Sequence, residues 1–356
     1  MNRPPVSFLA WAPSAGRAQD LAKELGGIHR CIYPLSDRRL VPIRYLVSSA
    51  LTVAHLVRFR PRSVVVQNPP IYPALIAWAY TKISGARLVL DNHPAAFGAK
   101  DNTQAQRMIR ATKWLAREAR GVLVTTSEWV DVVEKWGGRA LVIHEAPPSW
   151  TTSDPSPIVD RPVVLFSCVF AKDEPVSEVI EAARALPGVD FRITGDPRRA
   201  SGIDLEALPD NVTLTGWLNQ DSYAAEVERA HLLLALTTEP TSVMRAAYEG
   251  AFSRRVMVLS DWPALVELFP EAVFVANTAQ GIEMGLSRAV SSYPELVAST
   301  SLVERSALRR WVSQCSSLRL LLGLTDPQGS ETSGGTGAAT LIGGGTDPQG
   351  SGVSVP

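Results

Sequence analysis

The chain has 356 residues, of which 46% are hydrophobic and 20% are charged, and its 35 Lys and Arg balance 35 Asp and Glu. This composition excludes a disordered chain and a uniformly basic nucleic-acid-binding protein, and the length predicts about two domains. Cys31, Cys168 and Cys315 lie far apart with no CxxC pair, which excludes a disulfide scaffold or zinc finger and favours a reducing compartment.

The first half predicts a parallel sheet covered by helices on both faces. Strands are expected at Val6–Trp11, Ser63–Gln67, Arg87–Asp91, Gly121–Thr125 and Ala140–His144. Helices are expected at Arg17–Leu25, Tyr45–Val57, Pro73–Ile83, Thr103–Ala119 and Glu128–Trp136. Nearly continuous apolar strands separated by helices are typical of such sheets.

A second α/β ladder follows a linker-like stretch at 146–162, which is rich in Pro, Ser and Thr. Its strands are expected at Val163–Ser167, Val189–Thr194, Asn211–Thr215, Leu232–Leu236, Arg255–Ser260 and Val273–Ala276. Its helices are expected at Pro175–Leu186, Asp221–Arg229, Ser242–Phe252, Trp262–Phe269 and Ala279–Val290. We therefore expect two doubly wound domains, 1–155 and 156–315, facing each other across a cleft, and a Gly-, Ser- and Thr-rich disordered tail at 323–356.

Small and charged residues follow several predicted strands, where ligands of open α/β sheets bind. At the first turn, Ser14, Gly16 and Arg17 precede a helix and can meet an anion, although a plain tight turn is an equal alternative. In the second half the corresponding candidates are Ser167, Lys172, Thr194, Gly195, Trp217, Leu218, Thr238, Thr241, Arg245 and Glu249. Arg245 and Glu249 are four apart on one helix, which also fits an ordinary solvated ion pair.

Asp91 and His93 end a strand of the first half, where a substrate would lie. Histidine suits proton transfer near neutral pH, although a His that only hydrogen-bonds a loop is an equal alternative. The sequence contains no DxD, HExxH, GxSxG or Cys/His metal spacing. Metal-assisted hydrolysis and Ser-His-Asp acyl transfer therefore have no support in the sequence.

The order and spacing of these motifs resemble the two-domain GT-B glycosyltransferases of the family 4 type, and most closely the chitobiosyldiphosphodolichol beta-mannosyltransferase family. The resemblance covers roughly residues 5–290. It rests on the segments GRAQDLAKEL, VQNPPIYPAL, LVLDNH, VTTSEWVDVVEKWGGRALVIHEAPPSW, ITGDP, VTLTGWLNQDSYAAEVERAHLLLAL and VMRAAYEGAF.

The resemblance implies transfer of a hexose from a nucleotide-sugar donor, with GDP-mannose as one candidate, to a lipid-linked or glycan acceptor. It implies that the donor is a co-substrate and that no metal or other cofactor is needed. Glu249 matches the acidic residue that binds the nucleotide ribose. Thr241 stands where the family 4 pattern has its first Glu, a departure that the mannosyltransferase branch shares. His93, Asp91 and Glu145 are the candidates for the catalytic base.

Two other functions remain open: a GT-B-type sugar-nucleotide epimerase, and a non-catalytic binding subunit of a glycosyltransferase complex. The Thr241 departure favours the binding subunit, whereas the sparse set of acidic and His residues disfavours the epimerase.

The charges are unevenly distributed along the chain. The first 150 residues contain 20 Lys and Arg against 10 Asp and Glu, whereas the remainder contains 15 against 25. Seven arginines lie between Arg30 and Arg62, around the apolar stretch Tyr45–Val57, which is too short to span a bilayer. The hypothesis is that this stretch docks on an anionic membrane, and the alternative is a core helix between surface arginines. With no secretory signal at the start, we expect a cytoplasmic protein, peripheral on the membrane if it docks.

Overall fold

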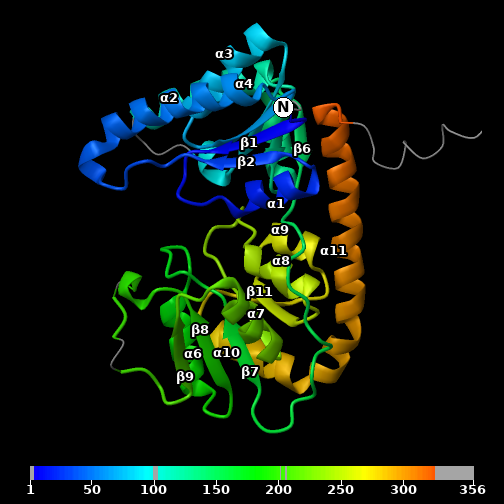
Figure 1. Ribbon diagram of the computed structural model, residues 1–356. Coiled ribbons are helices and arrows are strands. Elements are labelled where there is room, and N and C mark those ends of the chain that lie inside the picture. The colour runs from blue at the N-terminus through cyan, green and yellow to red at the C-terminus, as the bar shows by residue number, and fades with distance from the viewer. Residues whose placement is uncertain (1–3, 99–102, 201, 205–206, 325–356) are drawn as a thin grey trace, which may run out of the picture. The chain divides into compact units, whose positions relative to one another are not determined.

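Two parallel β-sheets, one in each half of the chain, dominate the computed structural model (Figure 1). The structure describes residues 4–98, 103–200, 202–204 and 207–324. The chain up to Leu324 forms one compact unit. The predicted tail, from residue 325 onward, lies outside the described residues.

The first sheet has the strand order β2-β1-β3-β4-β5-β6, with every neighbouring pair parallel. Its strands are β1 Val6–Ala10, β2 Ile28–Cys31, β3 Ser63–Asn68, β4 Arg87–Asn92, β5 Gly121–Val124 and β6 Ala140–Val142. The chain reverses its direction across the sheet between β1 and β3. Ligands of doubly wound sheets bind at the carboxyl ends of the strands beside such a switch point.

The second sheet has the strand order β12-β11-β10-β7-β8-β9 and is also entirely parallel. Its strands are β7 Val163–Phe166, β8 Asp190–Thr194, β9 Val212–Gly216, β10 Leu232–Ala235, β11 Val256–Ser260 and β12 Val273–Val275. Read from β9, this is the order 3-2-1-4-5-6 of dinucleotide-binding folds, with the switch point between β7 and β10.

Helices follow most of the strands in both sheets, as the apolar periodicity predicts. In the first half they are α1 Gly16–Glu24, α2 Val41–Phe59, α3 Tyr72–Ser84, α4 Thr103–Glu118 and α5 Ser127–Lys135. In the second half they are α6 Val176–Ala185, α7 Gln220–Arg229, α8 Arg245–Phe252, α9 Pro263–Leu268, α10 Ala279–Ser291 and α11 Tyr293–Leu322. Short 3-10 segments are η1 Arg38–Leu40, η2 Pro94–Ala96 and η3 Pro197–Arg199. Within the described ranges, each helix is too short or too polar to cross a bilayer.

Apart from the three 3-10 segments, one strand and one helix were absent from the sequence prediction. The edge strand β2 reads IHRC and is only partly buried, so it lacks the apolar run that marks an inner strand. The 30-residue helix α11 begins after the last predicted helix and contains the predicted domain end at residue 315. Its side chains Trp311, Cys315 and Leu318 belong to the hydrophobic core of the first half. The last turns of α11 therefore pack onto the first half, because a stripe at helical spacing buries apolar surface there.

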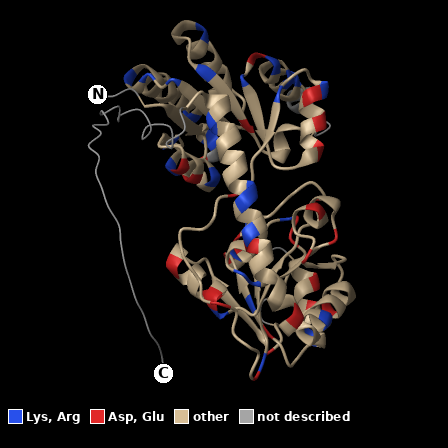
Figure 2. Cartoon of the chain, turned by 90° about the vertical axis from the view of Figure 1, so that its right-hand side faces the viewer, with Lys and Arg blue, Asp and Glu red and all other residues tan. Residues whose placement is uncertain are grey.

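The unequal distribution of charge is visible on the folded chain. Most acidic residues in Figure 2 lie over the second half, as the count in the sequence requires. Helix α11 runs through the middle of this view and is in contact with α8, β11 and β6.

Candidate functional site

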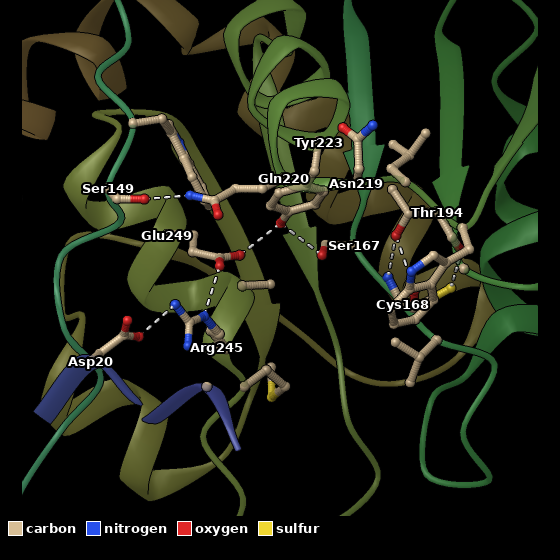
Figure 3. Close-up of a pocket in the computed structure, with 18 of the residues that line it drawn as sticks. Asp20, Ser149, Ser167, Cys168, Thr194, Asn219, Gln220, Tyr223, Arg245 and Glu249 are labelled. Carbon is tan, nitrogen blue, oxygen red and sulfur yellow. Dashed lines mark hydrogen bonds and ion pairs between the residues drawn. The ribbon is translucent and has the colours of Figure 1, made fainter. Parts of the chain in front are cut away.

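A cavity of about 800 Å³ lies at the carboxyl ends of the strands of the second sheet (Figure 3). Its walls come from the loops after β7, β8 and β9, from α7 and α8, and from α1 of the first half. The cavity lies beside the switch point of that sheet, between β7 and β10. Its size and place are those of a small-molecule site in a doubly wound fold.

The Glu249 carboxylate is held at the wall of this cavity by two donors (Figure 3). The Tyr223 hydroxyl donates to Glu249 Oε2 over 2.8 Å, and Arg245 Nε donates to Glu249 Oε1 over 3.0 Å. Ser167 Oγ lies 2.8 Å from the same Tyr223 oxygen. Burial and the charge of Glu249 raise the pKa of Tyr223 well above its usual range. The phenol therefore stays protonated, and Glu249, only 7% exposed, has a fixed orientation.

Another wall of the cavity is built where β7 and β8 end. Cys168 N donates to Thr194 Oγ1, and Thr194 Oγ1 donates to Cys168 O, each over 3.0 Å. Gly195 has φ +101°, and a β-carbon there would lie 2.7 Å from Cys168 O. Glycine is therefore the residue that fits this turn. Trp217, which is 72% exposed, adds an open aromatic ring to the lining of the cavity.

Arg245 links the two halves of the chain. Its NH2 donates to Asp20 Oδ2 over 3.0 Å, and its NH1 lies 3.4 Å from Glu145 Oε2. Burial lowers the pKa of Arg245, but Glu145, Glu249 and Asp20 together raise it above its usual range. The pair Arg245–Glu249 is thus part of an ion cluster that joins the two halves of the chain, rather than the isolated solvated ion pair that was the alternative from the sequence.

Arg17 lies next to this cluster and is buried, with only 8% of its surface exposed. Its Nε is 3.4 Å from Asp91 Oδ1 and its NH1 is 3.8 Å from Glu145 Oε1. Its NH2 has no hydrogen-bond partner among the described residues. Burial raises the pKa of Glu145. A buried guanidinium with an unpartnered nitrogen can accept an anionic ligand, because such groups are normally satisfied.

The structure brings eight of the thirteen predicted donor-binding residues into the lining of this cavity. They are Gly16, Ser167, Thr194, Gly195, Trp217, Leu218, Arg245 and Glu249. Three others line a second cavity of about 570 Å³, together with Pro94 and Ala95 from η2: they are Lys172, Thr238 and Thr241. Arg17 is next to the first cavity through the ion cluster, and Ser14 is exposed outside the lining of both.

The three predicted base candidates lie outside the lining of both cavities. Asp91 is buried and Glu145 is half-buried, and both carboxylates lie against Arg17. His93 is half-buried and directly precedes the two residues of η2 that line the second cavity. In the described ranges there is no group of three or more His, Cys, Asp or Glu side chains placed to hold a metal ion.

Several residues of the first cavity were not predicted from the sequence. The most consequential are Asp20, Trp150, Gln220 and Tyr223. In the sequence, Tyr223 looks like an ordinary helix residue and Trp150 like an ordinary linker residue. In the structure their two rings meet edge-on, with their centres 5.7 Å apart. Asp20 on α1 had no signal at all, because its partner Arg245 is 225 positions away in the chain.

No family model and no curated protein matches the chain. Solved structures do match it. Sucrose-phosphate synthase from Thermosynechococcus elongatus has a TM-score of 0.73 at 14% identity, covering 90% of this chain and 98% of that one. Anabaena Alr3699/HepE in complex with UDP and glucose has a TM-score of 0.68 at 16% identity, covering 90% and 99%. A glycosyltransferase from Rickettsia africae has a TM-score of 0.65 at 11% identity, covering 90% and 98%.

The chain has the GT-B fold. The predicted fold class is therefore confirmed, with two doubly wound sheets and a cavity lined from both halves. At these identities the likeness to solved structures establishes the fold alone. The predicted likeness to the mannosyltransferase family stays a prediction.

Proposed function

We propose that this GT-B chain is a glycosyltransferase that moves a hexose from a nucleotide-sugar donor to a lipid-linked or glycan acceptor. The observation that carries the proposal is the oriented Glu249 carboxylate in a cavity of about 800 Å³ at the switch point of the second sheet. The Alr3699/HepE structures support it, because they were solved with UDP and glucose and with UDP-glucose.

The donor occupies the first cavity in this proposal. The nucleobase of the donor lies by Thr194, Gly195 and Trp217, where the turn at Gly195 is narrow and the Trp217 ring is exposed. Glu249 accepts hydrogen bonds from the ribose hydroxyls. The diphosphate lies between Arg245, at the start of α8, and the start of α1 at Gly16, because both helix N-termini and a guanidinium favour negative charge.

The transferred sugar points toward the second cavity, where Lys172, Thr238 and Thr241 offer hydrogen-bonding groups. Of the three base candidates, we favour His93 for the acceptor hydroxyl, because it borders the residues of η2 that line this cavity. Asp91 and Glu145 are engaged by Arg17 and fit a role in orienting that guanidinium.

The reaction is proposed to be metal-independent, with the nucleotide-sugar as co-substrate and no other cofactor. The charge that builds up on a diphosphate leaving group is matched by Arg17 and Arg245, whose guanidinium groups both contact Glu145. Preorganised cations of this kind stabilise developing charge without a bound ion.

The candidates for the donor and the acceptor come from the sequence resemblance alone. GDP-mannose remains one candidate donor, and a lipid-linked acceptor fits the basic first half. We propose that the protein works on the cytoplasmic face of an anionic membrane.

The proposal is tested by incubating the protein with a panel of nucleotide-sugars and identifying the nucleotide and sugar products by mass spectrometry. One donor should be hydrolysed slowly without acceptor, and Glu249→Gln should weaken its binding about tenfold or more. Glu295→Gln, an exposed position on α11, is the matched control. Binding without turnover would favour a binding subunit, release of an epimerised sugar would favour an epimerase, and no binding at all would refute the proposal.

A further inference from the structure

Helix α2 places three of its polar side chains inward. Ser48, Thr52 and His55 are buried against the first sheet. The Trp11 indole donates to Thr52 Oγ1 over 2.9 Å, and Ser7 Oγ lies 2.8 Å from His55 Nε2. These hydrogen bonds fix the rotation of the helix about its axis, because turning it would leave buried polar groups unpartnered.

The opposite face of α2 is apolar and exposed. Ile43, Leu46, Val53 and Val57 are 50%, 72%, 48% and 58% exposed. Their spacing of three, seven and four residues places them on one side of the helix. A surface helix normally shows the reverse pattern, with its apolar face buried. We call this outward surface, made by residues 43, 46, 53 and 57, the α2 apolar face.

The surroundings of the α2 apolar face are basic. From Arg38 to Arg62 the chain contains no Asp or Glu. Arg39, Arg58 and Arg62 are exposed at or beyond the two ends of the helix. An apolar strip bordered by cations matches the interface of an anionic lipid leaflet, which offers acyl chains below a layer of phosphates.

A pocket of about 350 Å³ opens beside the same turns of α2. It is lined by Trp11 and Pro69 at the switch point of the first sheet, and by Tyr33, Arg44 and Tyr45. The rings of Trp11 and Tyr45 meet edge-on at 5.5 Å, and the Arg44 guanidinium lies 4.6 Å from the centre of the Tyr33 ring. Aromatic walls with one guanidinium suit a group that carries both an apolar surface and a phosphate.

We infer that α2 is a membrane-docking helix, which inserts its apolar face into an anionic lipid leaflet and presents the neighbouring pocket to the phosphate-bearing head of a lipid. The inference rests on the proposed function only in identifying that lipid as the acceptor. The pocket takes Arg44, Tyr45 and Ser48 from the inward side of the first turns of α2. The α2 apolar face begins on the outward side of the same turns, at Ile43 and Leu46. A second copy of the chain would bring the same arginines together, which opposes a dimer through this face.

Docking is tested by co-sedimenting the full chain with vesicles of phosphatidylcholine, with or without phosphatidylglycerol. Wild type should bind only the anionic vesicles, less strongly at high salt. Leu46→Asp should weaken binding about tenfold, and Leu46→Asp with Val57→Asp should weaken it further. Leu320→Asp is the matched control, because Leu320 is 78% exposed on α11 and away from α2. Equal binding by Leu46→Asp and Leu320→Asp, or no binding by wild type, overturns the inference.

A second comparison tests the pocket. Vesicles containing a polyprenyl phosphate and vesicles of equal surface charge containing phosphatidylglycerol should differ several-fold in affinity for wild type, and Arg44→Gln should remove that difference. No difference for wild type overturns the role of the pocket. Sedimentation velocity without vesicles tests whether a second copy covers the α2 apolar face. A wild-type dimer that Leu46→Asp converts to a monomer would show that a second copy, and not lipid, covers this face. Nucleotide-sugar binding, measured by calorimetry on the same variants, should not change, so failure of docking and failure of the proposed function are separable.

Discussion

The Arg245 guanidinium lies directly against Gly16, although the two residues come from opposite halves of the chain. A β-carbon on residue 16 would be only 3.0 Å from Arg245 NH1. The small residue at the start of α1 therefore leaves space for the cation of α8. This contact places a guanidinium and a helix N-terminus at the same point of the cavity, which is the arrangement proposed for the diphosphate.

Replacing Arg245 should affect both stability and ligand binding. Arg245→Met leaves Asp20, Glu145 and Glu249 without their shared cation. The side chain is 39% exposed, so solvent screening limits the loss of unfolding free energy to about 1–2 kcal/mol. The affinity for a nucleoside diphosphate should fall about tenfold or more. Urea unfolding and calorimetry measure the two effects, and Arg288→Met, an exposed position on α10, should change neither.

Removing the Tyr223 hydroxyl should loosen Glu249. Tyr223→Phe deletes the hydrogen bond to Glu249 Oε2 and the contact with Ser167, and should lower the unfolding free energy by about 1–2 kcal/mol. The control is Tyr248→Phe, a buried ring of α8 whose hydroxyl has no hydrogen bond in the described part of the chain. If both variants lose the same stability, the Tyr223–Glu249 hydrogen bond contributes nothing specific.

The turn at Gly195 should reject any side chain. Gly195→Ala forces a β-carbon to within 2.7 Å of Cys168 O at φ +101°, and we expect a loss of about 1–3 kcal/mol in unfolding free energy. Gly188→Ala is the control from the same half, because a β-carbon there meets no atom within 4 Å. Thermal unfolding of both variants checks the prediction, and an unchanged melting temperature for Gly195→Ala would contradict it.

The protein should become less stable in mild acid because His144 binds a proton more readily in the unfolded chain than in the folded chain. Burial, followed by Arg310 and Arg17, lowers the pKa of His144 from 6.5 to about 3. Between these values the unfolded chain binds a proton that the folded chain does not, so stability is complete above about pH 6.5 and declines as the pH falls toward 3. The loss from this one group is about 2 kcal/mol at pH 5.

The variant His144→Asn tests this assignment. Its amide can replace the ring nitrogen that lies 3.0 Å from Gln314 Nε2, and it carries no titrating group. Urea unfolding at pH 5 and pH 7.5 should show a smaller loss in acid for the variant than for wild type. His55, whose pKa burial lowers to about 4, keeps part of the acid sensitivity in both proteins. The same acid sensitivity in both proteins would show that His144 does not titrate as its burial requires.

Most of the local structure and part of the site were predictable from the sequence. Apolar runs such as Val64–Val66 are buried on both faces and predict inner strands, and the spacing of Arg245 and Glu249 places them on one side of a helix. The loops after β7, β8 and β9 were predicted as ligand-binding positions because ligands of parallel sheets lie at the carboxyl ends of the strands.

The partners of these residues, and the choice of which helix faces are buried, became visible only in the folded chain. Asp20 lies 225 positions from Arg245 in the sequence, and Trp311 is similarly far from the strands of the first sheet. Periodicity within a segment carries no information about contacts between residues so far apart in the sequence. The pattern of α2 is a clear example. Its sequence predicts one polar and one apolar face. The hydrogen bonds of Thr52 with Trp11 and of His55 with Ser7 show that the polar face is the buried one. A buried polar group is normally hydrogen-bonded, whereas an apolar side chain can remain at the surface, so the partners of Thr52 and His55 determine which face of α2 is buried.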